Sequence, residues 1–495
     1  MLSRRARLTS WSWLAPVAAA LLLALAALSV VLLGRLGYVV YAAALLAAVA
    51  AIVWNVERLL WALLLIDIPF GIDVNLLYRE AEGRLGAVGG LNISLTTLYL
   101  LALYFLWLLQ SLARSAPSPK MYLRQSWPLL LYLGFLGLSV PGALDKQLSI
   151  FELALLVQML LLYIYFSNRV QSRADLIFVL SCLTLGLGLQ SAIVLIVQLT
   201  GLDFSVASIS TRVDAALNYG SRAVGTFGSP NGLAAYLMLV LGPSASLLFV
   251  PLKRRYKVII GSCIATGILS LILTESRGGW LGFGLATLVI YLASWRRGYL
   301  PRRANIAILS ITLVAALMLQ PVIVARFSAE DTGVDNGRVP LNVLALELVR
   351  DNPVFGVGTN NYILAVQDYL TPAYANTWIY TVHNKFLQIW SEAGPLALLA
   401  YLSFLITLIG TALQLWRLNQ PLSAIVALSI GATICGHILH MQLDIFTGRV
   451  YVQTLWLLAA LLTALRYNLS VADSAALEKS AKTVLGGEQT EAQRV

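Results

Sequence analysis

The sequence predicts an all-α, polytopic integral membrane protein with about 12–14 transmembrane helices and a long extracytoplasmic loop. Of its 495 residues, 59% are hydrophobic and 12% are charged, and the mean hydropathy is +0.80. Runs of about 20 apolar residues, the length of a spanning helix, recur from end to end. The alternation expected of barrel strands is absent, so only helices can satisfy the backbone in lipid.

About fourteen apolar segments are candidate spans. They are residues 13–33, 36–56, 58–72, 95–112, 127–143, 148–166, 174–200, 231–250, 258–275, 279–295, 304–323, 386–416, 421–443 and 449–466. The third and fifth are short, so each is either a tilted or a re-entrant piece, and about twelve full spans remain without them. The basic start, Arg4 and Arg5, is interpreted as the cytoplasmic flank of the first span, because the apolar run is too long for an export signal.

The positions of Lys and Arg predict a multi-pass orientation in the cytoplasmic (inner) cell membrane. With the N-terminus in the cytoplasm, the basic clusters all fall on the cytoplasmic side; they are Arg114, Lys120 and Arg124; Arg169 and Arg173; Lys253, Arg254, Arg255 and Lys257; Arg296, Arg297, Arg302 and Arg303; and Arg417. Two polar segments, 201–230 and 324–385, then lie outside. Topology thus explains the net charge of +11, and no nucleic-acid partner is expected.

We expect one membrane domain, residues 1–466, followed by a polar cytoplasmic tail, residues 467–495. Within the long outer loop, residues 341–349 are apolar at helical spacing, which indicates a helix that lies on the membrane surface or packs over the site. Asp351-Asn352-Pro353 should end this helix, and residues 356–361 should form a tight turn.

Two outer arginines are not explained by the charge rule. Arg222 stands near the start of an outer helix, where Asn231 or Ser229 can act as the cap. Arg277 stands beside Gly278 and Gly279, whose N–H groups open the next helix. A helix N-terminus with Gly and Arg is suited to cradling a phosphate. The alternative is a partnership between Glu275 and Arg277 that closes a turn.

A third outer arginine, Arg338, precedes the loop helix, and its alternative role is that of a solvated cation. His383 and Asn384 open an apolar helix after the long polar loop, where such residues are costly unless they line water or bind a ligand. A His suits proton transfer near neutral pH, and Asn384 can orient it or bind sugar hydroxyls. Glu392 lies deeper in the same helix and needs a partner, for which an outer-loop Arg is a candidate.

His437, His440 and Asp444 share one face of another span and could ligate a metal. A polar patch inside the bundle is the favoured interpretation, so no metal site and no cofactor are predicted. Cys182, Cys263 and Cys435 lie inside apolar runs without metal-type spacing. The chain also has no phosphate loop and no Asp-x-Asp pair, so nothing supports nucleotide-driven pumping or a metal-bound nucleotide sugar.

Taken together, the motifs resemble the O-antigen ligase and polymerase family. In order they are Arg222 with residues 225–231, Ser276 to Trp280, Gly337-Arg338 through residues 351–358, and His383-Asn384 through Gly394. The resemblance covers about residues 200–410, whereas residues 1–190 match only as spans. A further Gly that the family often has three residues after Gly394 is Ala397 here, which affects helix packing more than chemistry.

The resemblance implies a metal-independent membrane glycosyltransferase with an extracytoplasmic site. The donor would be an undecaprenyl-diphosphate-linked glycan, and the acceptor a lipid, glycan or protein hydroxyl in polysaccharide assembly, by ligation or polymerisation. Arg222, Arg277 and Arg338 would hold the diphosphate and His383 would act on the acceptor. Asn384, Gly278, Gly279, Asn231 and Glu392 would bind substrate. A bicarbonate or anion transporter of the same family, which would use the arginines as an anion site, is the alternative, and a flippase-like carrier is a weaker one.

Overall fold

The computed structural model describes residues 56–113, 120–203, 205–206, 209–211, 221–298, 306, 320, 324, 335–372, 381–418 and 421–469. The predicted span 13–33, nearly all of 36–56 and 304–323, and most of the predicted tail therefore lie outside the described residues. The rest of the predicted pattern can be compared with the structure element by element.

The chain divides into two compact units. The first comprises Met1–Ile66 and Leu95–Ser118. Its described helices are α3 (Val56–Asp67) and α5 (Leu95–Leu112). Helix α3 covers the predicted short span and has 12 residues, too few to cross a bilayer. A 3-10 turn, Ile68–Phe70, with Pro69 in it follows directly, and this turn ends the helix.

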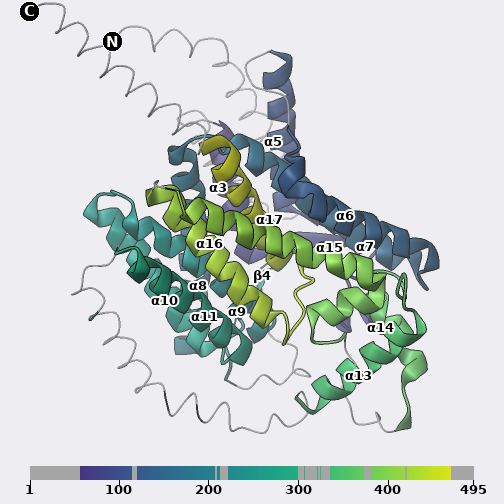
Figure 1. Ribbon diagram of the computed structural model, residues 1–495. Helices are drawn as coiled ribbons and strands as arrows, with labels where there is room; N and C mark the ends of the chain where they lie inside the picture. Colours follow the sequence, from purple (N-terminus) through teal and green to yellow (C-terminus); the bar gives the residue numbers. More distant parts are fainter. Residues whose placement is uncertain are drawn as a thin grey trace, which may run out of the picture. The chain divides into compact units, whose positions relative to one another are not determined.

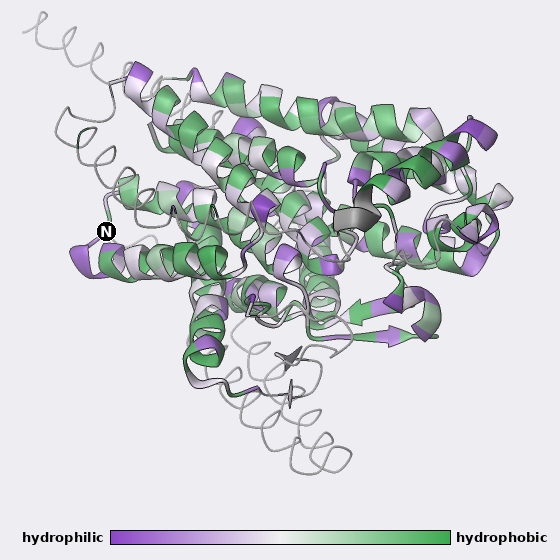
Figure 2. Ribbon diagram, turned by 90° about the horizontal axis from the view of Figure 1, so that it is seen from below, coloured by the Kyte–Doolittle hydropathy of each residue, from purple (hydrophilic) through white to green (hydrophobic). Residues whose placement is uncertain are grey.

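The second unit comprises Asp67–Ser94 and Pro119–Val495 and holds all the residues discussed below. Its long helices are α6 (Leu123–Ser139), α7 (Lys146–Arg169), α8 (Arg173–Thr200), α9 (Pro230–Ser246), α10 (Arg254–Leu273), α11 (Arg277–Arg296), α15 (Lys385–Trp416), α16 (Pro421–His440) and α17 (Arg449–Ala464) (Figure 1). Each begins and ends within a few residues of a predicted span. Among the described residues of both units, 9 helices are long and apolar enough to span a membrane, and Figure 2 shows hydrophobic residues along them. The protein is a polytopic membrane protein.

Two short antiparallel ribbons interrupt the helical pattern. Strand β1 (Asp73–Leu76) pairs with β2 (Leu91–Ser94), with α4 (Glu80–Arg84) between them, and β3 (Ser205–Val206) pairs with β4 (Ile209–Ser210). The sequence analysis did not predict them. Polar and apolar residues alternate in both β1 and β2, which suits a half-buried strand, but four residues are too few to be recognised by periodicity.

The described part of the outer loop contains one 17-residue helix and two helices of 4 residues each. Helix α13 (Asp335–Asp351) stops where Asp351-Asn352-Pro353 was predicted to end it. Helix α14 (Tyr362–Ala365) and the 3-10 helix Val366–Tyr369 follow. Between α13 and α14, Gly356, Gly358 and Asn360 have positive φ values of 65°, 97° and 60°, so the predicted tight turn is confirmed.

Glycines allow a close helix contact between α11 and α16. A Cβ on Gly436 would lie 2.2 Å from the carbonyl oxygen of Gly282, and a Cβ on Gly282 would lie 2.6 Å from that of Gly436. Neither position tolerates a side chain, so the two backbones touch, as small residues permit between membrane helices. This contact fixes α16 beside the start of α11.

The helices alternate in direction, so the bundle has two chemically different ends. The basic end carries the helix termini at Arg169, Arg173, Lys253, Arg254, Arg255, Lys257, Arg296, Arg297, Arg417 and Arg466. The opposite end, here called the motif end, carries the starts of α7, α9, α11, α15 and α17. Hydrogen bonds from Asn468 to the carbonyls of Ser167 and Val170 join two helices at the basic end. The separation agrees with the charge pattern of the sequence, and the assignment of the basic end to the cytoplasm stays a prediction.

Candidate functional site

The segment 441–448, which connects α16 to α17, joins the predicted motifs at the motif end. The backbone N–H of Lys385 donates to the carbonyl of Met441 at 2.9 Å. Asn384 Nδ2 donates to Gln442 Oε1 at 3.3 Å. Gly278 lies so close to α16 that a Cβ there would be 2.5 Å from His440 Cδ2. Three stretches far apart in sequence therefore meet at one connection.

Arg222 reaches this connection through an amide. Its Nε donates to the carbonyl of Thr274 at 2.9 Å, and a terminal nitrogen donates to Asn231 Oδ1 at 3.1 Å. Asn231 Nδ2 then donates to Asp444 Oδ2 at 2.6 Å. Both the oxygen and the nitrogen of the Asn231 amide are thus hydrogen-bonded, and Asn231 links the Arg222 cation to the Asp444 carboxylate. The helix cap itself is Ser229, which accepts from Gly232.

Arg277 is the first residue of α11, and its neighbours shape a close turn. Ser276 Oγ accepts from the N–H of Gly279 at 3.2 Å and so caps the helix. Glu275 has a φ of 49°, in the left-handed region. The N–H of Gly279 is therefore used by the cap, and Gly278 serves close packing against His440. Arg277 is half-buried and lies at the helix N-terminus, where an anion is favoured.

His383 is held by the loop just before α15. Its Nδ1 lies 3.0 Å from the carbonyl oxygen of Thr381. A carbonyl only accepts, so Nδ1 carries the proton and Nε2 is the basic nitrogen. Asn384 caps α15, because its Oδ1 accepts from the N–H groups of Phe386 and Leu387. Asn384 therefore fixes the helix start that bears His383.

The outer-loop turn is anchored at a break in α15. Gly394 has φ 81° and ψ 177°, and Pro395 has no N–H, so the helix ladder is interrupted there. The carbonyls of Ser391 and Glu392 accept instead from Val357 and Gly358, both at 2.9 Å. The loop backbone thus replaces the missing helical donors, as a buried break in a membrane helix requires.

Two buried carboxylates hold the same turn. Glu392 Oε1 accepts from the N–H of Tyr362 at 3.1 Å, and Glu152 Oε2 accepts from Thr359 Oγ1 at 3.0 Å. The sequence analysis suggested an outer-loop arginine as the partner of Glu392, and the structure gives it the loop backbone instead. Glu392 therefore lies against this turn, and its role in substrate binding stays a prediction.

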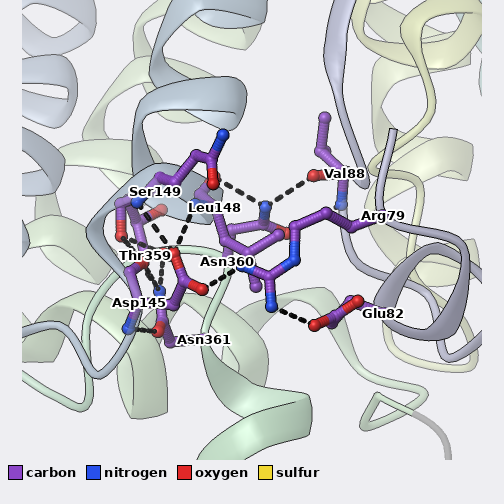
Figure 3. Close-up of polar contacts among 10 residues, drawn as sticks. Arg79, Glu82, Val88, Asp145, Leu148, Ser149, Thr359, Asn360 and Asn361 are labelled. Atoms are coloured by element: carbon purple, nitrogen blue, oxygen red, sulfur yellow. Dashed lines mark hydrogen bonds and ion pairs between the residues drawn. The ribbon is translucent and has the colours of Figure 1, made fainter. Parts of the chain in front are cut away.

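Asparagines 360 and 361 tie the turn to α7 and to the segment before β2 (Figure 3). Asn360 donates to the carbonyls of Val88 and Leu148, at 3.0 and 2.8 Å. Asn361 accepts from the N–H of Asp145 at 2.7 Å. Asp145 in turn binds Arg79, which also pairs with Glu82. The hydrogen bonds of Asn360 and Asn361 therefore fix the outer loop to the bundle.

Arg338 lies near the start of α13, and its side chain is outside the described part of the structure. The described contacts connect Arg222 and Asn231 to Asp444, Gly278 to His440, and Asn384 to Gln442. The convergence of Arg338 and His383 with the other two arginines stays a prediction.

A small cavity lies near the motif end. Its volume is about 30 Å³, enough for about two water molecules. Its lining includes the acidic and basic side chains of Glu152, Lys385 and His437, and the remaining lining residues are mostly aromatic and aliphatic. Lys385 Nζ donates to Gln388 Oε1 at 3.0 Å. His437 is 2% exposed, and its Nδ1 has no hydrogen-bond partner among the described residues.

The three residues considered for a metal have separate roles. His437 lines the cavity, His440 packs edge-on against Phe446, and Asp444 binds Asn231. Within the described ranges, no cluster of three His, Cys, Asp or Glu side chains is placed to hold a metal ion. His437 and His440 are buried and Asp444 is half-buried, and the favoured interpretation of a polar patch inside the bundle stays a prediction.

Sequence reasoning missed a buried ion pair beside this end. Arg449 is 4% exposed, and its Nε lies 3.3 Å from Asp73 Oδ2. A terminal nitrogen lies 3.9 Å from Asp67 Oδ2. A signal was available, because Arg449 starts a span on the predicted outer side, where the charge rule gives no reason for a cation. Lys385, which directly follows His383-Asn384, offered the same signal.

Part of the chain is similar to a known protein family. A family model described as O-antigen ligase matches residues 262–402. This range includes Arg277, Arg338, His383 and Glu392, whereas Arg222 and Asn231 precede it. A search of curated proteins finds no match. Residues 262–402, which run from α10 to α15 of the polytopic bundle, are thus similar to the O-antigen ligase domain family.

Proposed function

We propose that this protein transfers or polymerises a glycan from an undecaprenyl-diphosphate-linked donor onto an acceptor hydroxyl, on the extracytoplasmic face of the cytoplasmic membrane. The observation that carries the proposal is the family match over residues 262–402, combined with the meeting of three motifs at the segment 441–448. The three motifs meet at the end of the bundle opposite the basic clusters.

The arginines suit a diphosphate. Arg stays charged and forks onto two phosphate oxygens, which a Lys ammonium does not do. Arg222, Arg277 and Arg338 would neutralise the charge that builds up on the leaving diphosphate. In a site shielded from water, one well-placed donor of this kind typically accelerates a reaction by about 10²–10³-fold.

His383 suits the acceptor side of the reaction. The acceptor oxygen attacks the anomeric carbon, the bond from that carbon to the diphosphate oxygen breaks, and undecaprenyl diphosphate leaves. The hydroxyl proton passes to Nε2 of His383, because Nδ1 is held by the carbonyl of Thr381. Asn384 would orient His383 by capping α15, and Gly278 by its packing would fix the helix start that bears Arg277.

A reconstituted assay tests the proposal. The purified full-length protein in vesicles would receive lipid-linked glycan and an acceptor, with a chelator present and without ATP. We expect lengthened or transferred glycan under these conditions. Loss of transfer only on adding the chelator would contradict the metal-independent mechanism. No transfer, together with bicarbonate uptake by the same vesicles, would favour the transport alternative.

A further inference from the structure

Helix α13 presents apolar residues on two opposite faces. The inner face buries Leu341, Leu344, Ala345 and Leu348 against residues of α14 and its neighbours. On the outer face, Val339, Val343 and Leu346 are 69%, 42% and 49% exposed. Their spacing, i, i+4 and i+7, places them in one line along the helix. A loop helix facing water would carry polar residues there.

The outer stripe continues beyond the helix. Val354 and Phe355, in the turn after α13, are 56% and 54% exposed. Both lie against α15, since a Cβ on Gly394 would be 2.0 Å from the carbonyl oxygen of Val354 and 3.3 Å from Phe355 Cα. The exposed turn therefore adjoins a spanning helix at its break.

Helix α15 carries the stripe into the membrane. After Gly394 it exposes Leu396 (49%), Leu399 (57%) and Ile406 (67%). Exposed apolar side chains on a spanning helix face lipid tails. The apolar surface of α13 is thus continuous with a lipid-facing surface, and Figure 1 shows α13 near the start of α15.

We propose that α13, with Val354 and Phe355, is an interfacial segment whose outer face lies in the boundary between lipid headgroups and acyl chains. Its partner is the phospholipid of the leaflet at the motif end. Arg350 is exposed and falls four residues after Leu346, on the same stripe. Its aliphatic stem can lie on the apolar layer while the guanidinium contacts a headgroup phosphate. The proposal does not depend on glycan transfer.

Spin labels at single cysteines test this placement. The labels would be put at Val343 and Leu346, in a variant whose three native cysteines are replaced by alanine. The protein would be reconstituted in vesicles of phosphatidylethanolamine and phosphatidylglycerol. Leu399 on α15 is the lipid-facing control, and Asp368, exposed beyond α14, is the aqueous control. Relaxation by oxygen, which partitions into lipid, is compared with relaxation by a water-soluble nickel complex.

We expect the oxygen-to-nickel ratio at Val343 and Leu346 to exceed that at Asp368 and to approach that at Leu399. Equal ratios at Leu346 and Asp368 would show the stripe in water and overturn the proposal. Labels at both α13 positions shielded from oxygen and from nickel would also overturn it, because a second protein surface would then cover the stripe. All four positions are exposed, so the labels leave the core intact.

Discussion

At the scale of single residues, Gly394 has the strongest local requirement. Its φ of 81° with ψ of 177° belongs to a region that only glycine occupies readily. The Val354 carbonyl oxygen fills the place of a side chain. The sequence identified Gly394 as a motif residue, but it could not show why, because the reason is the outer loop docking on a broken helix.

Replacing Gly394 with alanine should therefore destabilise the protein. We expect Gly394→Ala to lower the free energy of unfolding by about 1–3 kcal/mol from backbone strain, with the clash adding to this. Gly410→Ala on the same helix is the control, since a Cβ there meets nothing within 4 Å. Thermal unfolding of both purified variants provides the comparison. Equal midpoints for the two would contradict the described packing.

Other residues show what a single sequence can predict. The outer arginines and His383 were chosen as candidate site residues because each is a cation or a His where membrane topology gives no reason for one, and their roles stay predictions. The bond between Asn231 and Asp444 joins residues 213 positions apart, and local spacing carries no trace of it. The same holds for Arg449 with Asp67 and Asp73.

At the scale of elements, the turn 356–361 depends on Glu392 as an acceptor. Removing that carboxylate in Glu392→Ala leaves the buried N–H of Tyr362 without its acceptor. This should cost about 1–3 kcal/mol. We expect faster hydrogen exchange across residues 352–362, with Glu392→Gln much less affected because it keeps an acceptor oxygen. Unchanged exchange in Glu392→Ala would contradict the anchoring role.

The bond between Arg79 and Asp145 gives the same region a pH dependence. Partial burial raises the pKa of Asp145, but hydrogen bonds from Arg79 and from the N–H groups of Leu148 and Gln147 outweigh it, so the pKa lies below its ordinary value. A carboxyl group whose pKa is lowered by folding stabilises the folded state at any pH above its ordinary pKa of 3.8. This stabilisation is lost as the pH falls through the lower pKa of the folded state.

Segment 79–94 should therefore stay protected from proteolysis at neutral pH and at pH 5. Protection should fall only in stronger acid. The variant Asp145→Asn should lose this protection already at neutral pH. The control variant Glu80→Gln should keep it, because Glu80 and Arg84 form an exposed ion pair that contributes little stability. Loss of protection already between pH 5 and 7 in the native protein would contradict the assignment to Asp145.

Element boundaries were predicted closely where spans are long and apolar. Helices α5, α8 and α11 begin and end within two residues of their predicted spans. Strands β1 and β2 were missed, because four-residue strands carry too little periodicity. For α13, the sequence predicted a helix that either lies on the membrane surface or packs over the site. In the structure, its inner face packs against α14 and its neighbours, and its outer face exposes apolar residues.

At the scale of the whole molecule, the charge pattern predicts which end of the bundle faces the cytoplasm. We expect a cysteine at Thr371, which is exposed in the outer loop, to react with an impermeant thiol reagent in intact spheroplasts. A cysteine at Lys253, at the basic end, should react only after lysis. The outer-loop position Ser208 lies outside the described residues and should behave like Thr371. The reverse pattern at Thr371 and Lys253 would contradict the orientation.

The central claim is that the motif end performs glycan transfer, and variants at both ends of the bundle test it most directly. Transfer from lipid-linked glycan would be measured for Arg277→Ala, Arg277→Lys and His383→Ala, each at equal amounts of folded protein. Arg297→Ala, at the basic end, is the matched control, since Arg297 packs on Trp416. We expect Arg277→Ala and His383→Ala to lose activity by about 10²-fold or more. Arg277→Lys should recover only part of it, because it keeps the charge without the fork, and Arg297→Ala should stay near the native rate. Native rates in both Arg277→Ala and His383→Ala would contradict the account.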